Sequence, residues 1–186
     1  MPWIKTIDES EAMESLKDIY NDLERKRGKV ANILKIHSLL PKTMETHMAL
    51  YLSVMFNQSK ISREDRELLA IIVSMTNQCQ YCIFHHAKAL NNYWKNKERI
   101  KNLLDHGYKN VRLSQRQLQQ LNYAEKLTLS PHQITEEDIM KLKNIGLSDE
   151  EILQINLVVS YFNFVNRIVL GLNVEFSEEE ISGYKY

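Results

Sequence analysis

The chain is short of the residues that break or staple a backbone. Among its 186 residues there are five glycines, three prolines and two cysteines. So few glycines exclude a collagen-like repeat, and two cysteines exclude a miniature fold held together by several disulfides. With 44% hydrophobic and 26% charged residues, the composition is that of a globular domain and not of a disordered chain.

The chain also has no excess of charge of either sign. The 24 Lys and Arg residues balance the 24 Asp and Glu residues, and the isoelectric point is near 7.0. A nucleic-acid-binding domain usually carries a basic excess, so no nucleic-acid partner is expected. The chain does not start with a basic-then-apolar signal segment, and its most apolar stretch, 152–172, is interrupted by asparagines and Arg167. We expect a soluble, cytoplasmic protein that does not associate with membranes.

Strand signals are missing as well. The sequence has no long alternating run of apolar and polar residues and no Asn-Gly or Asp-Gly hairpin turn. Apolar residues recur instead at spacings of three and four, as in segments 16–23 and 44–55. The sequence therefore predicts an all-α fold, a helical bundle.

Residues that favour helix ends divide the chain into segments. Four helix starts are expected at residues of the N-cap or first-turn type: Asp8, Pro41, Ser62 and Ser148. The first of these helices should end near Gly28 and the second at about Phe56. Ser148 with Glu151 forms a capping box before a long apolar run.

An internal similarity predicts two related units. A shift of 86 residues places Ser62 on Ser148 and Asn77 on Asn163, and the apolar positions between them also agree. Chance similarity between two amphipathic helices is the alternative. We expect one all-helical domain over 1–186, with a cysteine-bearing unit at about 41–107 and a cysteine-free unit at about 114–175.

The reactive side chains gather around a Cys-x-x-Cys motif. Cys79, Cys82 and His86 follow one another at i, i+3 and i+7, which places them on one face of a helix. Thr76 and Asn77 are residue types that cap helices, so Cys79 is expected in the first turn of a new helix. The unpaired N–H groups and the dipole of a helix N-terminus favour a thiolate over a thiol there.

A reversal of the chain near Thr76 would bring Glu67 next to His86, because the two residues lie equally far from such a turn. The carboxylate would then orient the imidazole, and the imidazole would serve Cys82 one helical turn away. On an unbroken helix Glu67 and Cys79 would be about 18 Å apart. The hypothesis is a thiol site of Glu67, Cys79, Cys82 and His86 that requires no metal and no organic cofactor.

Other interpretations of these residues stay open. Cys79, Cys82 and His86 could bind zinc, although no second ligand pair completes a structural site. The thioredoxin fold uses the same cysteine pair but needs a βαβ unit that the sequence lacks. The cysteines could also sense oxidation without turnover in a binding or regulatory module, or be inert core residues. Taken alone, Glu67 would more often be a solvated charge.

The spacing of the reactive residues resembles the alkyl hydroperoxidase D / carboxymuconolactone decarboxylase family, and within it the peroxidase-related branch. The residues that carry the resemblance are Glu67, Asn77, Cys79, Tyr81, Cys82 and His86. Residues 161–168 resemble the second repeat of that branch, and the similarity extends over about 29–175. The resemblance implies an all-helical fold of two related units that assembles into a homo-oligomer.

The resemblance also implies a reaction, the reduction of hydroperoxides. Cys82 matches the cysteine that becomes sulfenic acid, Cys79 its resolving and proton-donating partner, and Glu67 and His86 the proton relay. A dihydrolipoyl or thioredoxin-like dithiol would return the electrons. The helix-terminus argument alone would favour Cys79 as the nucleophile. Tyr81 replaces a histidine of the best-known hydroperoxidases, and lactone decarboxylation is the weaker interpretation because decarboxylase members generally lack the cysteine pair.

Overall fold

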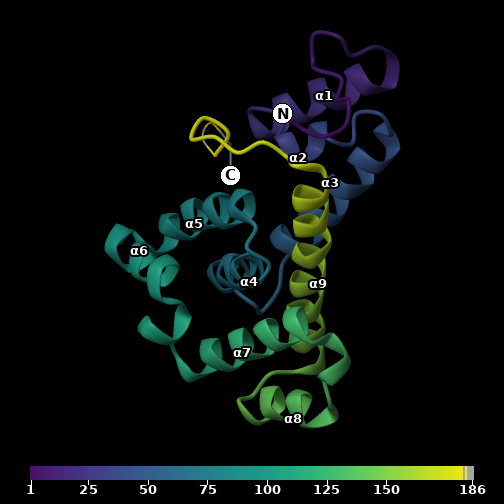
Figure 1. Cartoon of the computed structure of the whole chain (residues 1–186). Helices are drawn as coiled ribbons and strands as arrows, with labels where there is room; N and C mark the ends of the chain where they lie inside the picture. Colours follow the sequence, from purple (N-terminus) through teal and green to yellow (C-terminus); the bar gives the residue numbers. More distant parts are fainter. Residues whose placement is uncertain (182, 184–186) are drawn as a thin grey trace. The chain divides into compact units, whose positions relative to one another are not determined.

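The structure, a computed structural model, describes residues 1–181 and 183, and helices are the only regular elements over these residues (Figure 1). In chain order they are α1 (Glu14–Arg27), α2 (Asn32–Lys35), α3 (Pro41–Phe56), α4 (Arg63–Thr76), α5 (Gln80–Trp94), α6 (Lys97–His106), η1 (Tyr108–Asn110), α7 (Gln115–Leu129), η2 (Pro131–Gln133), α8 (Glu136–Asn144) and α9 (Asp149–Leu172), where η marks a single 3-10 turn. The predicted all-α fold is confirmed.

Three of the four predicted helix starts are confirmed by their caps. Pro41 is the first residue of α3. The Ser62 hydroxyl accepts the backbone N–H of Asp65 at 3.0 Å and so caps α4. At the start of α9, the Ser148 N–H donates to the Glu151 carboxylate at 2.8 Å and the Glu151 N–H donates to the Ser148 hydroxyl at 3.3 Å, a complete capping box.

The predicted start of the first helix is wrong, although its end is correct. The carbonyl of Asp8 accepts the N–H of Glu11 at 3.0 Å and closes a separate turn, so α1 begins only at Glu14. Gly28 ends α1 with φ of 87°, a left-handed conformation that glycine adopts without steric cost.

The described residues form two compact units, one of 1–53 with the part of the chain from 167 onwards, and one of 54–166. The core of the first unit joins Leu16, Tyr20 and Leu23 of α1 to Leu34 and Met44. In the second unit, all the residues of the predicted thiol site are found. The predicted repeat of two related units stays a prediction.

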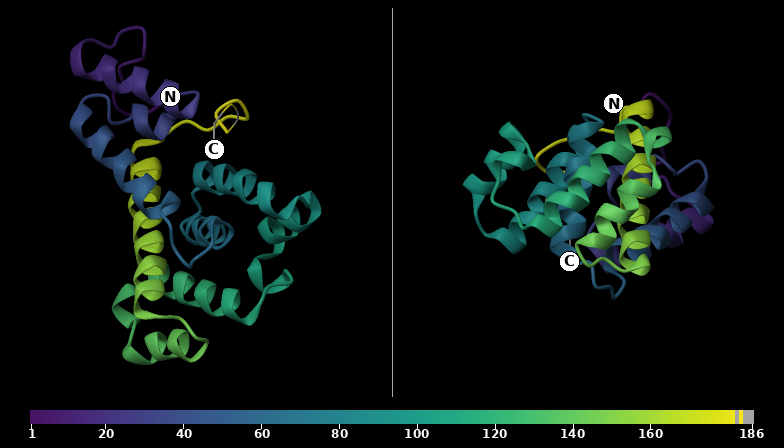
Figure 2. Two further views of the ribbon diagram at one scale, coloured as in Figure 1. Left: turned by 180° about the vertical axis from the view of Figure 1, so that it is seen from behind. Right: turned by 90° about the horizontal axis from the view of Figure 1, so that it is seen from below.

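Helix α4 is the centre of the second unit. Both α5 and α7 pack against it, and Figures 1 and 2 show α4 nearly end-on between these two helices. Every residue from Arg66 to Ser74 is buried, so the helix is covered on all faces. The buried Arg66 guanidinium donates to the carbonyls of Ile61 at 3.0 Å and Met55 at 2.9 Å, so its N–H donors have acceptors within the protein.

The chain reverses between α4 and α5. Helix α4 ends at Thr76, and the N–H of Cys79 then turns back to the carbonyl of Ser74 at 2.8 Å. Gln78 adopts φ of 58° in this turn. Cys79 is the N-cap of α5, so the reversal predicted from the equal spacing of Glu67 and His86 is confirmed.

Thr76 and Asn77 do not have the capping role predicted for them. Thr76 is the last residue of α4, and its hydroxyl donates to the carbonyl of Ile72 at 2.8 Å. The Asn77 side chain donates to the side-chain oxygens of Asn163 and Asn166 on α9, at 3.0 Å each. A tertiary contact therefore outcompetes the local capping bond that the residue type favours.

The left-handed turn residue leads to a stability prediction. Gln78→Val should destabilise the protein by about 1 kcal/mol or more, since a β-branched side chain fits poorly at positive φ. Urea unfolding measures the change. Gln80→Val, two residues on at the exposed start of α5, is the matched control and should change the free energy of unfolding little. Equal losses in both variants would contradict the assignment of strain to Gln78.

Helix α9 is long and apolar enough to cross a membrane by length and composition, with a mean hydropathy of 1.4 in its most apolar window. In the protein, 44% of that window is buried. Its polar side chains also bond within the second unit, because Asn156 donates to the Tyr123 hydroxyl at 2.8 Å and Asn163 to the Thr128 hydroxyl at 3.0 Å. These contacts are typical of a core helix, which passes the same test of length and composition.

Candidate thiol site

The two cysteines lie side by side at the start of α5. Both are reduced and buried. Cys79 is the N-cap residue, and Cys82 is the third residue of the helix, so its backbone N–H is one of those that has no acceptor within the helix. The Cys82 thiol hydrogen-bonds to the Cys79 sulfur.

The environment separates the acidities of the two thiols. The hydrogen bond from the Cys82 thiol, helped by the Cys82 backbone N–H, lowers the pKa of Cys79 against the effect of burial. The pKa of Cys82 is raised well above its ordinary value by its hydrogen bond to Cys79, by burial and by the charge on Cys79. The pair therefore favours one negative charge, on Cys79, as the helix-terminus argument predicts.

Glu67 and His86 approach as the sequence predicts. The Nδ1 atom of His86, on α5, lies 2.5 Å from Oε2 of Glu67, on α4, and the carboxylate is completely buried. The ring of His86 also packs edge-on against Phe162 of α9, with 4.5 Å between ring centroids. Because Nδ1 faces the carboxylate, Nε2 is the ring nitrogen that Glu67 does not engage, and Cys82 lies one helical turn away from His86.

Arg63 is a member of the site that the sequence analysis missed. Its Nε and Nη2 atoms lie 2.6 Å and 2.5 Å from Oε1 of Glu67, the oxygen that His86 does not use. The guanidinium stacks on the ring of Phe56 at 3.6 Å and donates to the Met55 carbonyl at 3.3 Å. The signal was the i, i+4 spacing of Arg63 and Glu67, which is also the spacing of an ordinary ion pair on a helix surface.

Two partners keep the buried Glu67 ionised. Burial alone, the largest effect, would raise the pKa of Glu67, but the charges and hydrogen bonds of His86 and Arg63 together lower it. The ionised carboxylate therefore stabilises the fold at pH above its ordinary pKa of 4.5, and this contribution is lost as the pH falls through the lower, folded-state pKa.

Tyr81 and His85 occupy a different face of α5. Their rings stack with 4.2 Å between centroids, and Nδ1 of His85 lies 2.7 Å from the carbonyl of Tyr81. Both contacts are within one turn of the helix.

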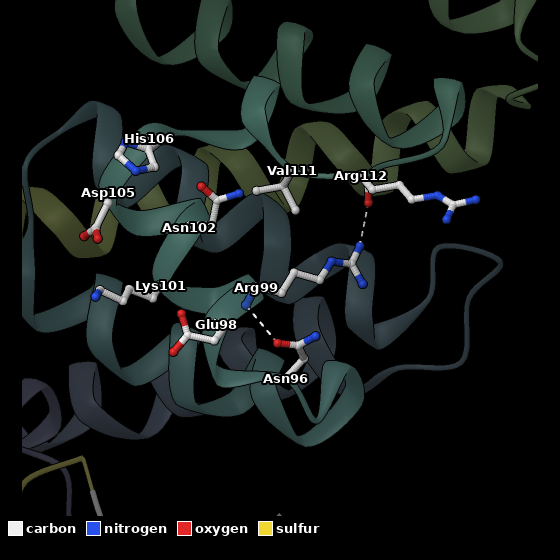
Figure 3. A pocket seen from close by; sticks show the side chains of 9 residues that line it. All are labelled: Asn96, Glu98, Arg99, Lys101, Asn102, Asp105, His106, Val111 and Arg112. Carbon is white, nitrogen blue, oxygen red and sulfur yellow. Dashed lines mark hydrogen bonds between the residues drawn. The ribbon is translucent and has the colours of Figure 1, made fainter.

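A hollow of about 540 Å³ in the second unit lies on α6 and the segment after it, away from the cysteines (Figure 3). Its walls are mostly polar and charged: Asn96, Glu98, Arg99, Lys101, Asn102, Asp105, His106, Val111 and Arg112. Figure 3 shows Arg99 reaching toward Arg112, whose carbonyl accepts a hydrogen bond from Nη2 of Arg99 at 2.7 Å. Since none of the predicted site residues lines it, this hollow is separate from the thiol site.

The zinc interpretation concerns Cys79, Cys82 and His86. Over residues 1–181 and 183, no group of three or more His, Cys, Asp or Glu side chains is arranged to hold a metal ion. The Nδ1 atom of His86 instead faces Glu67.

Comparisons with known proteins address the family. The sequence pattern of the carboxymuconolactone decarboxylase family matches residues 41–108, which contain Glu67, both cysteines and His86. No curated protein matches the chain.

Solved structures share the fold over nearly the whole chain. A peroxidase-related protein from Ralstonia eutropha JMP134, described as an alkylhydroperoxidase AhpD core, is 20% identical with a TM-score of 0.85, covering 97% of this chain and 94% of that one. A peroxidase-related protein from Silicibacter sp. TM1040 is 26% identical, with a TM-score of 0.82 and 91% coverage of both chains. A variant of the debrominase Bmp8, in complex with 2,3,4-tribromopyrrole, is 16% identical with a TM-score of 0.76, covering 96% of this chain and 97% of that one. Residues 41–108 carry the sequence pattern of the carboxymuconolactone decarboxylase family, and the chain has the all-helical, AhpD-like fold of these solved structures.

Proposed function

We propose that the protein is a thiol-dependent peroxidase and disulfide oxidoreductase that reduces hydroperoxides through Cys79 and Cys82. The observation that carries the proposal is the buried hydrogen bond between Glu67 and His86, one helical turn from the cysteine pair, in which the Cys82 thiol hydrogen-bonds to the Cys79 sulfur. This arrangement combines a thiolate, a second thiol and an oriented imidazole, which are the groups that thiol redox chemistry requires.

The reaction balances with these groups. A thiolate of the pair attacks the hydroperoxide; an S–O bond forms, the O–O bond breaks, and the alkoxide leaves as an alcohol with the proton that the cysteine pair held. The second sulfur then attacks the sulfenic acid, an S–S bond forms, and hydroxide leaves as water with a proton supplied by His86. Glu67 holds the imidazole in place. An external dithiol reduces the disulfide, and no metal or organic cofactor takes part.

The order in which the sulfurs react depends on one proton. When the pair loses one proton, the lowered pKa of Cys79 and the raised pKa of Cys82 place the charge on Cys79, and the Cys82 thiol donates to it. Transfer of that proton to Cys79 creates a Cys82 thiolate next to a Cys79 thiol, which can protonate the leaving alkoxide. First attack by Cys82, the role that the family resemblance implies, is therefore compatible with a resting thiolate on Cys79.

The proposal includes partners and assembly. A hydroperoxide is the substrate, a dihydrolipoyl or thioredoxin-like dithiol is the electron donor, and the protein acts as a homo-oligomer in the cytoplasm. The name of Bmp8 as a debrominase shows that the fold also supports other chemistry.

A single-turnover experiment tests the proposal. One equivalent of an alkyl hydroperoxide should oxidise the reduced protein to a Cys79–Cys82 disulfide, seen as the loss of two hydrogens by mass spectrometry, with one equivalent of alcohol released. Dihydrolipoamide should restore the thiols and support repeated turnover. A disulfide that forms without repeated turnover would favour a redox sensor, and an unreactive cysteine pair would exclude both interpretations.

A further inference from the structure

A buried network of polar side chains runs from α9 to the cysteine pair. Nδ2 of Asn77 donates to Oδ1 of Asn166 at 3.0 Å, and Nδ2 of Asn166 lies 3.2 Å from the Ser74 hydroxyl oxygen. Ser74 and Asn166 are completely buried, in a region where polar groups are present only with partners. The bond from Asn77 fixes the orientation of the Asn166 amide, so its NH₂ group must face Ser74.

Both Ser74 and Asn166 also hydrogen-bond to the Cys82 side chain. The Ser74 oxygen accepts from Asn166, which leaves its own hydrogen to point at the sulfur. The Asn166 NH₂ group can only donate hydrogen bonds. Besides Cys79, the Cys82 sulfur therefore has two hydrogen-bond donors, the Ser74 hydroxyl and the Asn166 amide. This arrangement stabilises a negatively charged sulfur better than a neutral thiol.

We propose that Ser74 and Asn166 are further catalytic residues, which stabilise the negative charge that develops on the Cys82 sulfur when its proton passes to Cys79. The inference rests on the proposed thiol function. It gives a role to Asn166, the residue that helix α9 contributes to the site. The donors are held in place before reaction, so no reorganisation is needed when the charge appears.

In the reaction these donors serve the first step. The proton of the Cys82 thiol moves to the Cys79 thiolate, and the Cys82 thiolate that results accepts hydrogen bonds from Ser74 and Asn166. That thiolate forms the S–O bond with the hydroperoxide oxygen while the O–O bond breaks, and Cys79 returns the proton to the leaving alkoxide. No oxidant beyond the hydroperoxide is needed.

The test isolates Cys82 by placing each variant in the Cys79→Ser background. Ser74→Ala should raise the pKa of Cys82, because a hydrogen bond to the charged sulfur is lost, and so should lower the rate of alkylation by iodoacetamide at a fixed pH below that pKa by about tenfold or more. Thr128→Val is the matched control. It removes one buried hydroxyl from the same network, where Thr128 accepts from Asn163, but Thr128 does not bond to Cys82.

The outcomes separate this inference from the proposed function. Slower alkylation in Ser74→Ala but not in Thr128→Val, with equal urea unfolding midpoints, supports the inference even if the wild-type protein consumes no peroxide. Equal alkylation rates in the two variants would overturn it. Asn166→Asp provides a second test that preserves the shape of the side chain: its carboxylate should slow alkylation further by repelling the thiolate, and an unchanged rate would count against the role of Asn166.

Discussion

Cys82→Ser should abolish repeated turnover of hydroperoxide with a dithiol donor, a loss of at least about a thousandfold, because a serine hydroxyl neither ionises nor forms a disulfide. Cys79 is the one other cysteine in the sequence, so in this variant it has no thiol partner in the same chain with which to form a disulfide. Peroxide consumption in the presence of dihydrolipoamide measures the effect. Equally rapid consumption by the variant would contradict the proposed function.

Cys79→Ser is the matched companion to this variant. It should also lose repeated turnover, but it should form a sulfenic acid on Cys82 that dimedone traps, if Cys82 attacks first. Accumulation of sulfenic acid on Cys79 in the Cys82→Ser protein, with none on Cys82 in the companion, would reverse the order of attack. That result would leave the peroxidase proposal intact.

Glu67→Gln should cost both stability and activity. The half-buried Arg63 guanidinium loses its carboxylate partner inside the protein, and breaking a buried ion pair destabilises a protein by about 3 to 5 kcal/mol. His86 loses the acceptor that orients it, so the rate of disulfide formation should fall by about a hundredfold or more. Urea unfolding and stopped-flow oxidation by an alkyl hydroperoxide measure the two effects.

The Arg63→Met/Glu67→Gln double variant separates the two effects. Without Arg63 no unpaired charge is left, so most of the stability should return while the rate stays low. Arg116→Met is a control for the loss of an ion pair, because Arg116 pairs with Glu151 at 2.5 Å away from the cysteines; it should lower stability and leave the rate unchanged. A double variant with a wild-type rate would show that the Glu67–His86 bond is structural.

The single variant Arg63→Met should change the pH dependence of stability. Burial then acts against His86 alone, so the pKa of Glu67 should rise above its wild-type value. The stability that depends on the ionised carboxylate should accordingly be lost at a higher pH during acid titration than in the wild-type protein. Identical acid-unfolding curves would show that Arg63 does not hold Glu67 in its charged form.

Local rules explain why the helices could be predicted. A serine before acidic residues caps a helix wherever it stands, and Ser62 and Ser148 do so here. Such rules fail where a neighbouring element offers a better partner, which is why Asn77 bonds to α9 and does not cap α5. The helix start predicted at Asp8 was wrong for a local reason, since the Asp8 carbonyl closes a separate turn.

The contact between Glu67 and His86 could be predicted from the sequence, because it needs only two helices joined by one turn, with both residues equally far from that turn. The pairing of Arg63 with Glu67 could have been predicted from their i, i+4 spacing. The low exposure of Arg63 could not, since it depends on Phe56 and on the helices around α4. A surface ion pair and a buried one have the same spacing and very different energies.

The sequence by itself determined the helical class, the helix that carries both sulfurs and the pairing of the acid with the imidazole, because each follows from spacing along one chain. The tertiary structure alone decided which charges are buried and what faces Cys82, since Ser74 and Asn166 are 92 residues apart and meet only when α9 packs in the second unit. The hydrogen bond between Cys79 and Cys82 is local, but the burial and the distant partners that also set the acidity of Cys82 are not properties of local sequence.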